Sequence, residues 1–319
     1  MISGENQLFT LIRCADDADW LAQRTKGVGG SDVAAIMGLS PWRTPMQVWA
    51  EKTGRAEPED LSGKPYVTFG VTMEPVIGKW YADHHPERKV RRVNAICQSI
   101  TRPWAQASLD YEVRDGNRWG VLEIKTARTA ADWQSGVPAY YLTQVTHYLS
   151  VTGREFADVA VFFRDTCEYA TYRIERDEED IAAVNQAVDS FWHDYVEAGV
   201  MPVLAGTSGE AATLTSMYGL PDGEIGFTLD PDVVQAISDY QDAAAREKEA
   251  REAKTAASTK LAAQIGNRKG LETDVARVTW VRSERTTLDT KRLQAEHPEI
   301  FAEYSCRVVR NGGIRIKEL

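Results

Sequence analysis

The chain has 319 residues, 43% of them hydrophobic and 26% charged, which is typical of a globular protein large enough to bury a substantial core. Its formal net charge of −10 at pH 7 excludes a protein that coats nucleic acid by charge alone, so any DNA contact would have to be local or metal-assisted. The four cysteines stand singly, and the lack of a CxxC pair excludes the usual zinc and iron–sulfur spacings and argues against a disulfide framework.

The apolar residues form no run that approaches the roughly 18 residues of a membrane-spanning helix. The first residues, "MISGENQLFTLIRC", lack a basic segment followed by an apolar one. We therefore expect neither a membrane span nor a secretory signal, and we expect a cytoplasmic location.

Helix and strand signals alternate along the first 202 residues. Caps, a first-turn proline and apolar spacing predict helices, which are expected from Ser31, from Thr44 to Gly54, over about 72–84, over 139–152 and over 181–198. Runs of β-forming residues bounded by turns predict strands, which are expected over 89–100, 105–113, 120–127, 156–163 and 169–175.

A change in composition predicts two units. Residues 203–226 are rich in Gly, Ser, Thr and Pro, which is typical of a linker or surface loop. Residues 227–319 predict a C-terminal extension with a long helix from Pro231, a strand over 274–281, a short helix after Asp289 and a hairpin at "VVRNGGIRI". This extension is a candidate for self-assembly or partner binding.

The segment "SLDYEVRDGNRWGVLEIKTA" predicts a hairpin that gathers charge on one face. A turn at Gly116-Asn117 places Asp110 opposite Glu123, with Leu109 against Ile124 and Tyr111 against Leu122. Because side chains two apart on a strand point the same way, Lys125 joins the two acids.

Two interpretations of this face remain open. Two acids about 5 Å apart repel each other unless a cation lies between them, and Mg²⁺ or Mn²⁺ favours such oxygen ligands. Alternatively, the face is solvated and the lysine offsets the acids.

Five motifs in order resemble one nuclease family. They are Arg24 before "GVGGSDVAAIMG", "GVTME" ending at Glu74, Asp110 on a strand, "LEIKTA", and "PAYYLTQVTHYL" with Tyr141 and Gln144. Together they resemble the YqaJ-type viral recombinases, the lambda-exonuclease branch of the PD-(D/E)XK nuclease superfamily.

The resemblance implies a fold and an activity. The fold is α/β of the mixed α+β kind: a PD-(D/E)XK restriction-endonuclease-like core over residues 1–202, with a central mixed sheet flanked by helices. The activity is a metal-dependent 5′–3′ exonuclease on double-stranded DNA that leaves 3′ single-stranded overhangs for recombination by single-strand annealing. An endonuclease or structure-specific nuclease of the same superfamily is the alternative, and a non-enzymatic assembly module is another.

The resemblance also implies roles for the acidic cluster. Asp110, Glu123, the Ile124 carbonyl and Glu74 would hold Mg²⁺ or Mn²⁺, with two ions expected. Lys125 would position or help deprotonate the attacking water and offset charge in the transition state, or would be only a structural counter-ion.

Two further groups of residues receive roles by resemblance. Tyr141 and Gln144 share a helix face and would orient Lys125 and water or touch DNA, although Tyr141 could simply pack. Arg24 and Ser31 would hold a substrate phosphate, and Ser31, which follows two glycines, is also a candidate helix cap.

Six other residues are weaker candidates. Asp32 is assigned to the first helical turn rather than to the metal site, and His147 is assigned as a plain helical histidine. Trp42 and Arg43 could contact DNA or pack at a rim. Adjacent His84 and His85 do not share a helix face, so they make a poor metal pair.

The expected partners follow from the resemblance too. They are double-stranded DNA ends, a single-strand annealing protein and further copies of the chain, with a ring-shaped trimer expected. The location implied is a bacterial cytoplasm in which a phage or prophage protein acts.

Overall fold

The computed structural model describes residues 8–58, 61, 63–219, 223–281, 283–306 and 314–317. Contacts divide the chain into two units, residues 1–219 and 220–319. None of the helices in the described ranges is long and apolar enough to cross a bilayer.

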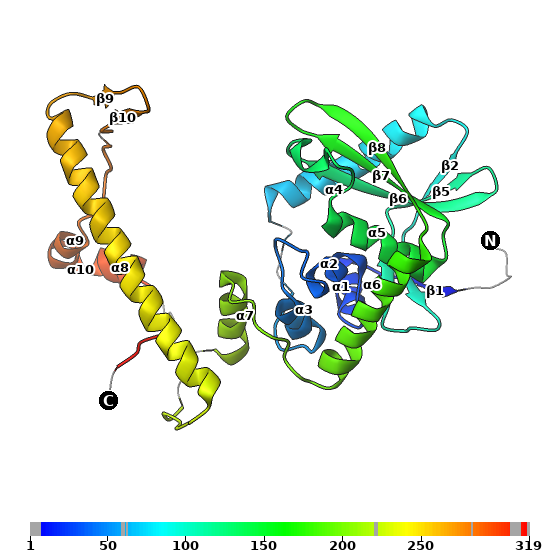
Figure 1. Cartoon of the computed structure of the whole chain (residues 1–319), viewed down its shortest axis with the longest axis horizontal. Coiled ribbons are helices and arrows are strands. Elements are labelled where there is room, and N and C mark those ends of the chain that lie inside the picture. The colour runs from blue at the N-terminus through cyan, green and yellow to red at the C-terminus, as the bar shows by residue number, and fades with distance from the viewer. Residues whose placement is uncertain are drawn as a thin grey trace. The chain divides into compact units, whose positions relative to one another are not determined.

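The N-terminal unit is built on a five-stranded mixed sheet (Figure 1). Its strand order is β2-β5-β6-β7-β8, and the strands span Lys89–Arg92, Tyr111–Asp115, Arg118–Ala127, Phe156–Phe163 and Glu168–Glu175 respectively. The β6–β7 pair is parallel and the other three pairs are antiparallel. The mixed α+β class with a central mixed sheet, expected from the sequence, is confirmed.

One helix covers each face of this sheet (Figure 1). Helix α4 (Pro65–His84) packs Ile77 and Tyr81 against Leu122 and other residues of one face. Helix α5 (Ala139–Thr152) packs Val145 and Leu149 against Val121 and other residues of the opposite face. Because side chains alternate along β6, Glu123 and Lys125 lie on the face that α5 covers.

A second group of elements packs beside α5. It contains an antiparallel sheet of order β1-β3-β4 (Phe9–Ile12, Ile96–Ser99 and Gln106–Ser108). Its helices are α1 (Asp17–Arg24), α2 (Gly30–Ile36), α3 (Pro45–Lys52), α6 (Glu178–Phe191) and the π-helix η2 (Trp192–Glu197). The short helix η1 (Ala131–Trp133) instead packs Trp133 against Phe163 and Tyr172 of the central sheet. Residues of α2, α3 and α6 share one apolar cluster.

Several expected elements differ from the structure. The helix expected over about 72–84 begins seven residues earlier, at Pro65, and the strand expected over 274–281 is shorter, Arg277–Thr279. The segment 89–100 is not one strand, because the chain turns after Arg92 and enters a different sheet at Ile96. The segment 105–113 is likewise split, with β4 and β5 separated at Leu109-Asp110. Within 203–226, the stretch Ser208–Tyr218 forms helix α7, which is capped by Thr207 and packs on α3 of the N-terminal unit.

The C-terminal unit is dominated by helix α8 (Pro231–Ile265), as expected from its composition. The hairpin β9–β10 (Gly270–Glu272, Arg277–Thr279) and helices α9 (Thr290–Glu296) and α10 (Pro298–Tyr304) follow. The hairpin expected at "VVRNGGIRI" lies largely outside the described residues.

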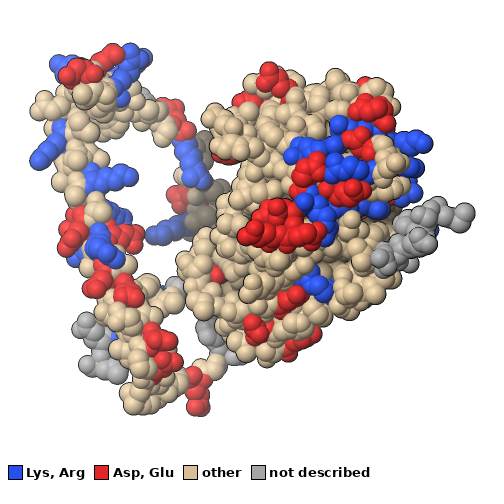
Figure 2. Space-filling view, turned by 45° about the vertical axis from the view of Figure 1, so that its right-hand side comes forward, with Lys and Arg blue, Asp and Glu red and all other residues tan. Residues whose placement is uncertain are grey.

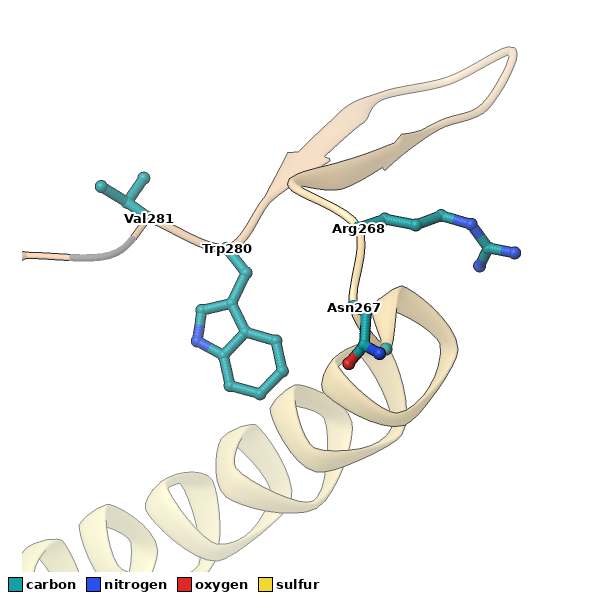
Figure 3. A pocket seen from close by; sticks show the side chains of 5 residues that line it. Asn267, Arg268, Trp280 and Val281 are labelled. Atoms are coloured by element: carbon teal, nitrogen blue, oxygen red, sulfur yellow. The ribbon is translucent and has the colours of Figure 1, made fainter.

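A hollow in this unit lies at the end of α8, where the Trp280 ring projects over the helix (Figure 3). Gly266, Asn267, Arg268 and Val281 complete its lining. This lining offers no carboxylate, imidazole or thiol.

Candidate active site

Glu123 and Lys125 meet a glutamine from the helix above them. The Lys125 Nζ atom lies 2.6 Å from Glu123 Oε1 and 3.2 Å from Gln144 Oε1. The Gln144 amide in turn donates to Glu123 Oε1 over 2.8 Å. Strand β6 and helix α5 therefore bring together three of the residues that the sequence assigned to one site.

Asp110 joins this group from the break between β4 and β5. Regular pairing of β5 with β6 ends at Tyr111 and Leu122, in the register expected from the turn. Beyond that pair, Asp110 Oδ2 accepts a hydrogen bond of 2.8 Å from the Ile124 backbone N–H, so the carboxylate takes the place of a ladder bond. Asp110 therefore lies beside Glu123, as predicted.

The predicted pairing of Leu109 with Ile124 is wrong. Leu109 is buried in the cluster on the α5 side of the sheet, whereas Ile124 is buried in the cluster on the α4 side. The break in the strand before Asp110 interrupts the alternation of side chains, so the register of the hairpin does not extend to Leu109.

The buried carboxyl groups of Asp110 and Glu123 lie close together, and both have raised pKa values. Burial and the neighbouring Glu123 raise the pKa of Asp110 well above its usual range. Burial also raises the pKa of Glu123, although the Lys125 charge opposes this. Burial alone would lower the pKa of Lys125, but the two carboxylates outweigh it and raise that pKa. Lys125 is thus charged and donates its hydrogen bonds.

One acceptor in the group has no partner. Glu123 Oε2 is buried and accepts no hydrogen bond, although an unsatisfied buried carboxylate oxygen costs free energy. An adjacent hard cation would satisfy this oxygen and relieve the repulsion with Asp110, so the donor set fits Mg²⁺ or Mn²⁺. Within the described ranges no three His, Cys, Asp or Glu side chains are already arranged as a complete metal cluster.

Glu74 lies near the acids but is held by a cation of its own. It comes from α4, and its charge contributes to raising the pKa of both Asp110 and Glu123. Its carboxylate lies 2.8 Å from the Arg92 guanidinium at the end of β2. Arg92, which the sequence did not single out, therefore fixes where Glu74 points.

Tyr141 and Tyr148 flank the group on α5. The Tyr141 ring lies beneath Lys125, with Nζ 4.7 Å from its centroid, so a cation–π contact holds the amine. The Tyr148 hydroxyl accepts from Gln144 over 2.8 Å. A Cβ on Gly30 would lie 2.4 Å from the Tyr148 ring, so only glycine lets α2 approach here. The helical spacing from Gln144 to Tyr148 was the signal that could have revealed Tyr148.

Arg24 and Ser31 form a pair at the start of α2. The Arg24 guanidinium donates to Ser31 Oγ over 2.8 Å and stacks on the Trp20 ring at 4.8 Å. Ser31 is exposed, so its hydroxyl is accessible to a ligand. Gly29, rather than Ser31, is the N-cap of this helix. The cap interpretation of Ser31 is therefore wrong, whereas its pairing with Arg24 agrees with a shared role.

Asp32 lies next to Ser31 and is linked to Arg24 through Lys52. Its fully buried carboxylate lies 2.7 Å from Lys52 Nζ and 3.0 Å from Arg43 Nη1, and it accepts from the Gly29 N–H. Lys52 also donates to the Arg24 carbonyl over 2.8 Å. Asp32 does lie in the first turn of α2, as expected. No local pattern revealed Lys52, because its partners are about 20 and 28 residues away along the chain.

The weaker histidine candidates have ordinary structural contacts. His84 is hydrogen-bonded to the Trp80 carbonyl, and His85 lies against the Tyr81 ring. His147 is fully buried, and its Nε2 lies 3.2 Å from the Val28 carbonyl and 3.0 Å from that of Gln106. These partners make Nε2 the protonated nitrogen. The interpretation of His147 as a structural helical residue is confirmed.

Burial of His147 gives the fold a predicted pH dependence. Burial and then the Arg102 charge lower its pKa from 6.5 to about 4. The unfolded chain binds the proton first, so stability is lost as the pH falls below about 6.5 and the loss levels off near pH 4. This group contributes about 3 kcal/mol to that loss. We expect the free energy of unfolding to fall less steeply with decreasing pH, between pH 7 and 4, in His147→Gln than in the parent. An identical pH dependence in the two proteins would contradict the burial of neutral His147 as its cause.

Acidic and basic side chains are interleaved on the face of the N-terminal unit that Figure 2 shows. Several pairs among the described residues have the same mixed character: Arg118 with Glu155 and Glu175, Arg173 with Asp115 and Asp158, and Arg91 with Glu112. Because charges of both signs alternate there, this face carries a mixed field rather than a broad positive one.

A family model matches the part of the chain that contains the site. Residues 19–155 match the family model of the YqaJ-like viral recombinase domain, and this range contains every site residue assigned from the sequence. The chain is also 35% identical over 205 residues to the uncharacterized protein YqaJ of Bacillus subtilis (strain 168). The resemblance to the YqaJ-type viral recombinases, inferred from the five motifs, is confirmed. The match covers 63% of this chain and 63% of the relative's length.

Two solved structures are also similar. The alkaline exonuclease LHK-Exo from Laribacter hongkongensis is 24% identical, with a TM-score of 0.49 over 62% of this chain and 99% of that one. A phage related exonuclease from Haemophilus somnus 129PT is 12% identical, with a TM-score of 0.40 over 54% of this chain and 94% of that one.

Proposed function

We propose that the N-terminal unit is a divalent-metal-dependent deoxyribonuclease that degrades double-stranded DNA from 5′ ends and leaves 3′ single strands for annealing. The observation that carries this proposal is the meeting of Asp110, Glu123, Lys125 and Gln144 at one point, with a buried oxygen of Glu123 left without a partner. The match of residues 19–155 to a viral recombinase domain supports it.

The proposal assigns the metal-binding role to Asp110, Glu123, Glu74 and the Ile124 carbonyl. The bound Mg²⁺ or Mn²⁺, with two ions expected, would supply Lewis-acid activation of water and of the phosphate. Glu74 would reach the ion from α4, where its carboxylate is paired with Arg92. The crowding of the carboxylates favours cation binding over an empty, repelling pair.

Lys125 supplies positive charge in this scheme. Its amine is held by Glu123, Gln144 and the Tyr141 ring, so three contacts fix its direction. A fixed ammonium group stabilises the charge that develops on the phosphate oxygens and orients the attacking water, without rearranging during the reaction. Gln144 and Tyr141 then act by holding Lys125 and Glu123 in place.

Arg24 and Ser31 are assigned to the phosphate at the 5′ end. A guanidinium and an exposed hydroxyl 2.8 Å apart offer convergent donors to phosphate oxygens. The chain of contacts from Ser31 through Gly30 and Tyr148 to Gln144 links this pair to the acidic group. A terminal phosphate held by Arg24 would set the distance from the strand end to the cleaved bond.

End-labelled linear duplex DNA tests the activity and its polarity. We expect Mg²⁺ to support release of nucleotides from 5′ ends, and we expect no release with chelator. Covalently closed circular DNA of the same sequence is the control for an endonuclease and should stay intact. Cleavage of the circle at the rate of the linear form would replace the exonuclease by the endonuclease alternative, and no cleavage of either with any divalent ion would reject the proposal.

Arg24→Ala should reduce digestion of 5′-phosphorylated ends more than digestion of 5′-hydroxyl ends. Loss of one charge-assisted contact costs about 1.5–3 kcal/mol, so the preference for the phosphorylated end should fall by roughly 10- to 100-fold. The comparison uses two duplexes that differ only in that phosphate. Equal losses on both would remove the terminal-phosphate role from Arg24.

We also expect the chain to form a trimer and to bind a single-strand annealing protein. The expected trimer can be measured by light scattering on the purified protein. A single-strand annealing protein, if it binds, would raise the mass further in the same measurement.

A further inference from the structure

Trp42 is an exposed aromatic side chain beside the candidate active site. It lies between α2 and α3, and 65% of its surface is exposed. Its ring meets the Tyr140 ring edge to face at 4.9 Å and lies 6.4 Å from the Tyr141 ring. Most of the indole surface is therefore open to a ligand, although its position is fixed by two rings of α5.

The turn that carries Trp42 is held on both sides. Ser40 Oγ accepts from the backbone N–H groups of Trp42 and Arg43, each over 3.2 Å. Arg43 is tied to Asp32 and Glu51 by ion pairs of 3.0 and 2.7 Å. Arg43 is thus held by carboxylates of the protein, and Trp42 is the exposed aromatic side chain of the turn.

The indole ring is close to the group that would contact the scissile phosphate. Trp42 packs on Tyr141, and the same Tyr141 ring carries Lys125 Nζ at 4.7 Å. A ligand that places a phosphate at Lys125 brings whatever is attached to that phosphate toward Trp42. In a DNA strand, the attached group is a nucleoside with a flat aromatic base.

We propose that Trp42, supported by Tyr140, is a stacking platform for a nucleobase next to the phosphate held at Lys125, a role that rests on the proposed function of that site. Stacking suits an enzyme that degrades DNA without regard to sequence, because every base offers a π-face. It also supplies binding free energy that the acidic net charge of the chain does not.

Binding of duplex DNA that carries 2-aminopurine in its terminal base pair tests this role. The assay is run in chelator, so that cleavage does not intervene, with the full chain as parent, Trp42→Ala and Trp42→Phe. We expect the parent to quench the probe and Trp42→Ala to bind on the order of 10- to 100-fold more weakly without quenching. Trp42→Phe, which keeps a ring, should retain most of the affinity.

Leu39→Ala is the matched control, because Leu39 is an exposed apolar residue just before the same turn. It should bind and quench like the parent. Parental affinity and quenching in Trp42→Ala would overturn the proposal, as would a parent that fails to bind DNA. A change in mass by light scattering in Trp42→Ala would also overturn it, by showing that another copy of the chain covers the ring.

The stacking role of Trp42 and the nuclease activity of the site are tested independently. A parent that digests linear duplex while Trp42→Ala binds normally rejects only the stacking role. A parent that binds through Trp42 but digests nothing with Mg²⁺ rejects the nuclease and retains the platform. In an active parent, Trp42→Ala should raise KM far more than it lowers kcat, since the ring contributes to binding rather than to the chemical step.

Discussion

Lys125→Met is expected to lower Mg²⁺-dependent digestion of linear duplex DNA by about 10²- to 10⁴-fold. The variant keeps the length of the side chain but removes the charge that lies 2.6 Å from Glu123 and above the Tyr141 ring. Initial rates on end-labelled duplex at saturating Mg²⁺ measure the effect.

Lys79→Met is the control for this change. Lys79 is an exposed lysine of α4 that pairs with Asp83, and its loss should leave the rate unchanged. A circular dichroism spectrum and a melting curve verify that Lys125→Met is folded. Digestion by Lys125→Met at the parental rate would remove Lys125 from the chemistry.

Asp32→Ala is expected to lower the free energy of unfolding of the N-terminal unit by about 3–5 kcal/mol. The change leaves Lys52, whose side chain is almost fully buried, without its counter-ion and leaves Arg43 with only Glu51. It also removes the acceptor of the Gly29 N–H at the start of α2. Urea unfolding followed by tryptophan fluorescence measures the loss, and every tryptophan except Trp280 lies in the N-terminal unit.

Asp83→Ala provides the comparison, because Asp83 makes an exposed ion pair within one helix and its removal should cost less than about 1 kcal/mol. The pH dependence gives a second check. Despite burial, Lys52 and Arg43 hold the pKa of Asp32 far below its usual range. Its contribution is therefore present above about pH 4 and is lost as the pH falls further. Equal stabilities of Asp32→Ala and Asp83→Ala would contradict the anchoring role of Asp32.

The sequence predicted the parts of the site that depend on local periodicity. Alternation along the strand places Glu123 and Lys125 on one face of the sheet. Helical spacing places Tyr141 and Gln144 on one face of the following helix. The turn at Gly116 fixed the register of β5 with β6 as far as Tyr111. These features need only the repeat of a strand or a helix and the geometry of one turn.

The rest depends on contacts between distant segments. The strand break at Asp110 is stabilised by the hydrogen bond from the Ile124 backbone N–H to the Asp110 side chain. The sequence periodicity of a strand does not predict this bond. The buried contacts of Lys52 with Asp32, and of Tyr148 with Gly30, join segments that only the folded chain brings together. Helix α7 was missed because Gly, Ser and Thr are common in loops, whereas its cap and its packing on α3 stabilise the helix.

Crystals of the protein soaked in Mn²⁺ measure the binding of a divalent ion by the acidic group directly. An anomalous peak about 2 Å from carboxylate oxygens of both Asp110 and Glu123 is the predicted result. Absence of a peak there at millimolar Mn²⁺, with Glu123 still bonded only to Lys125 and Gln144, would contradict the account.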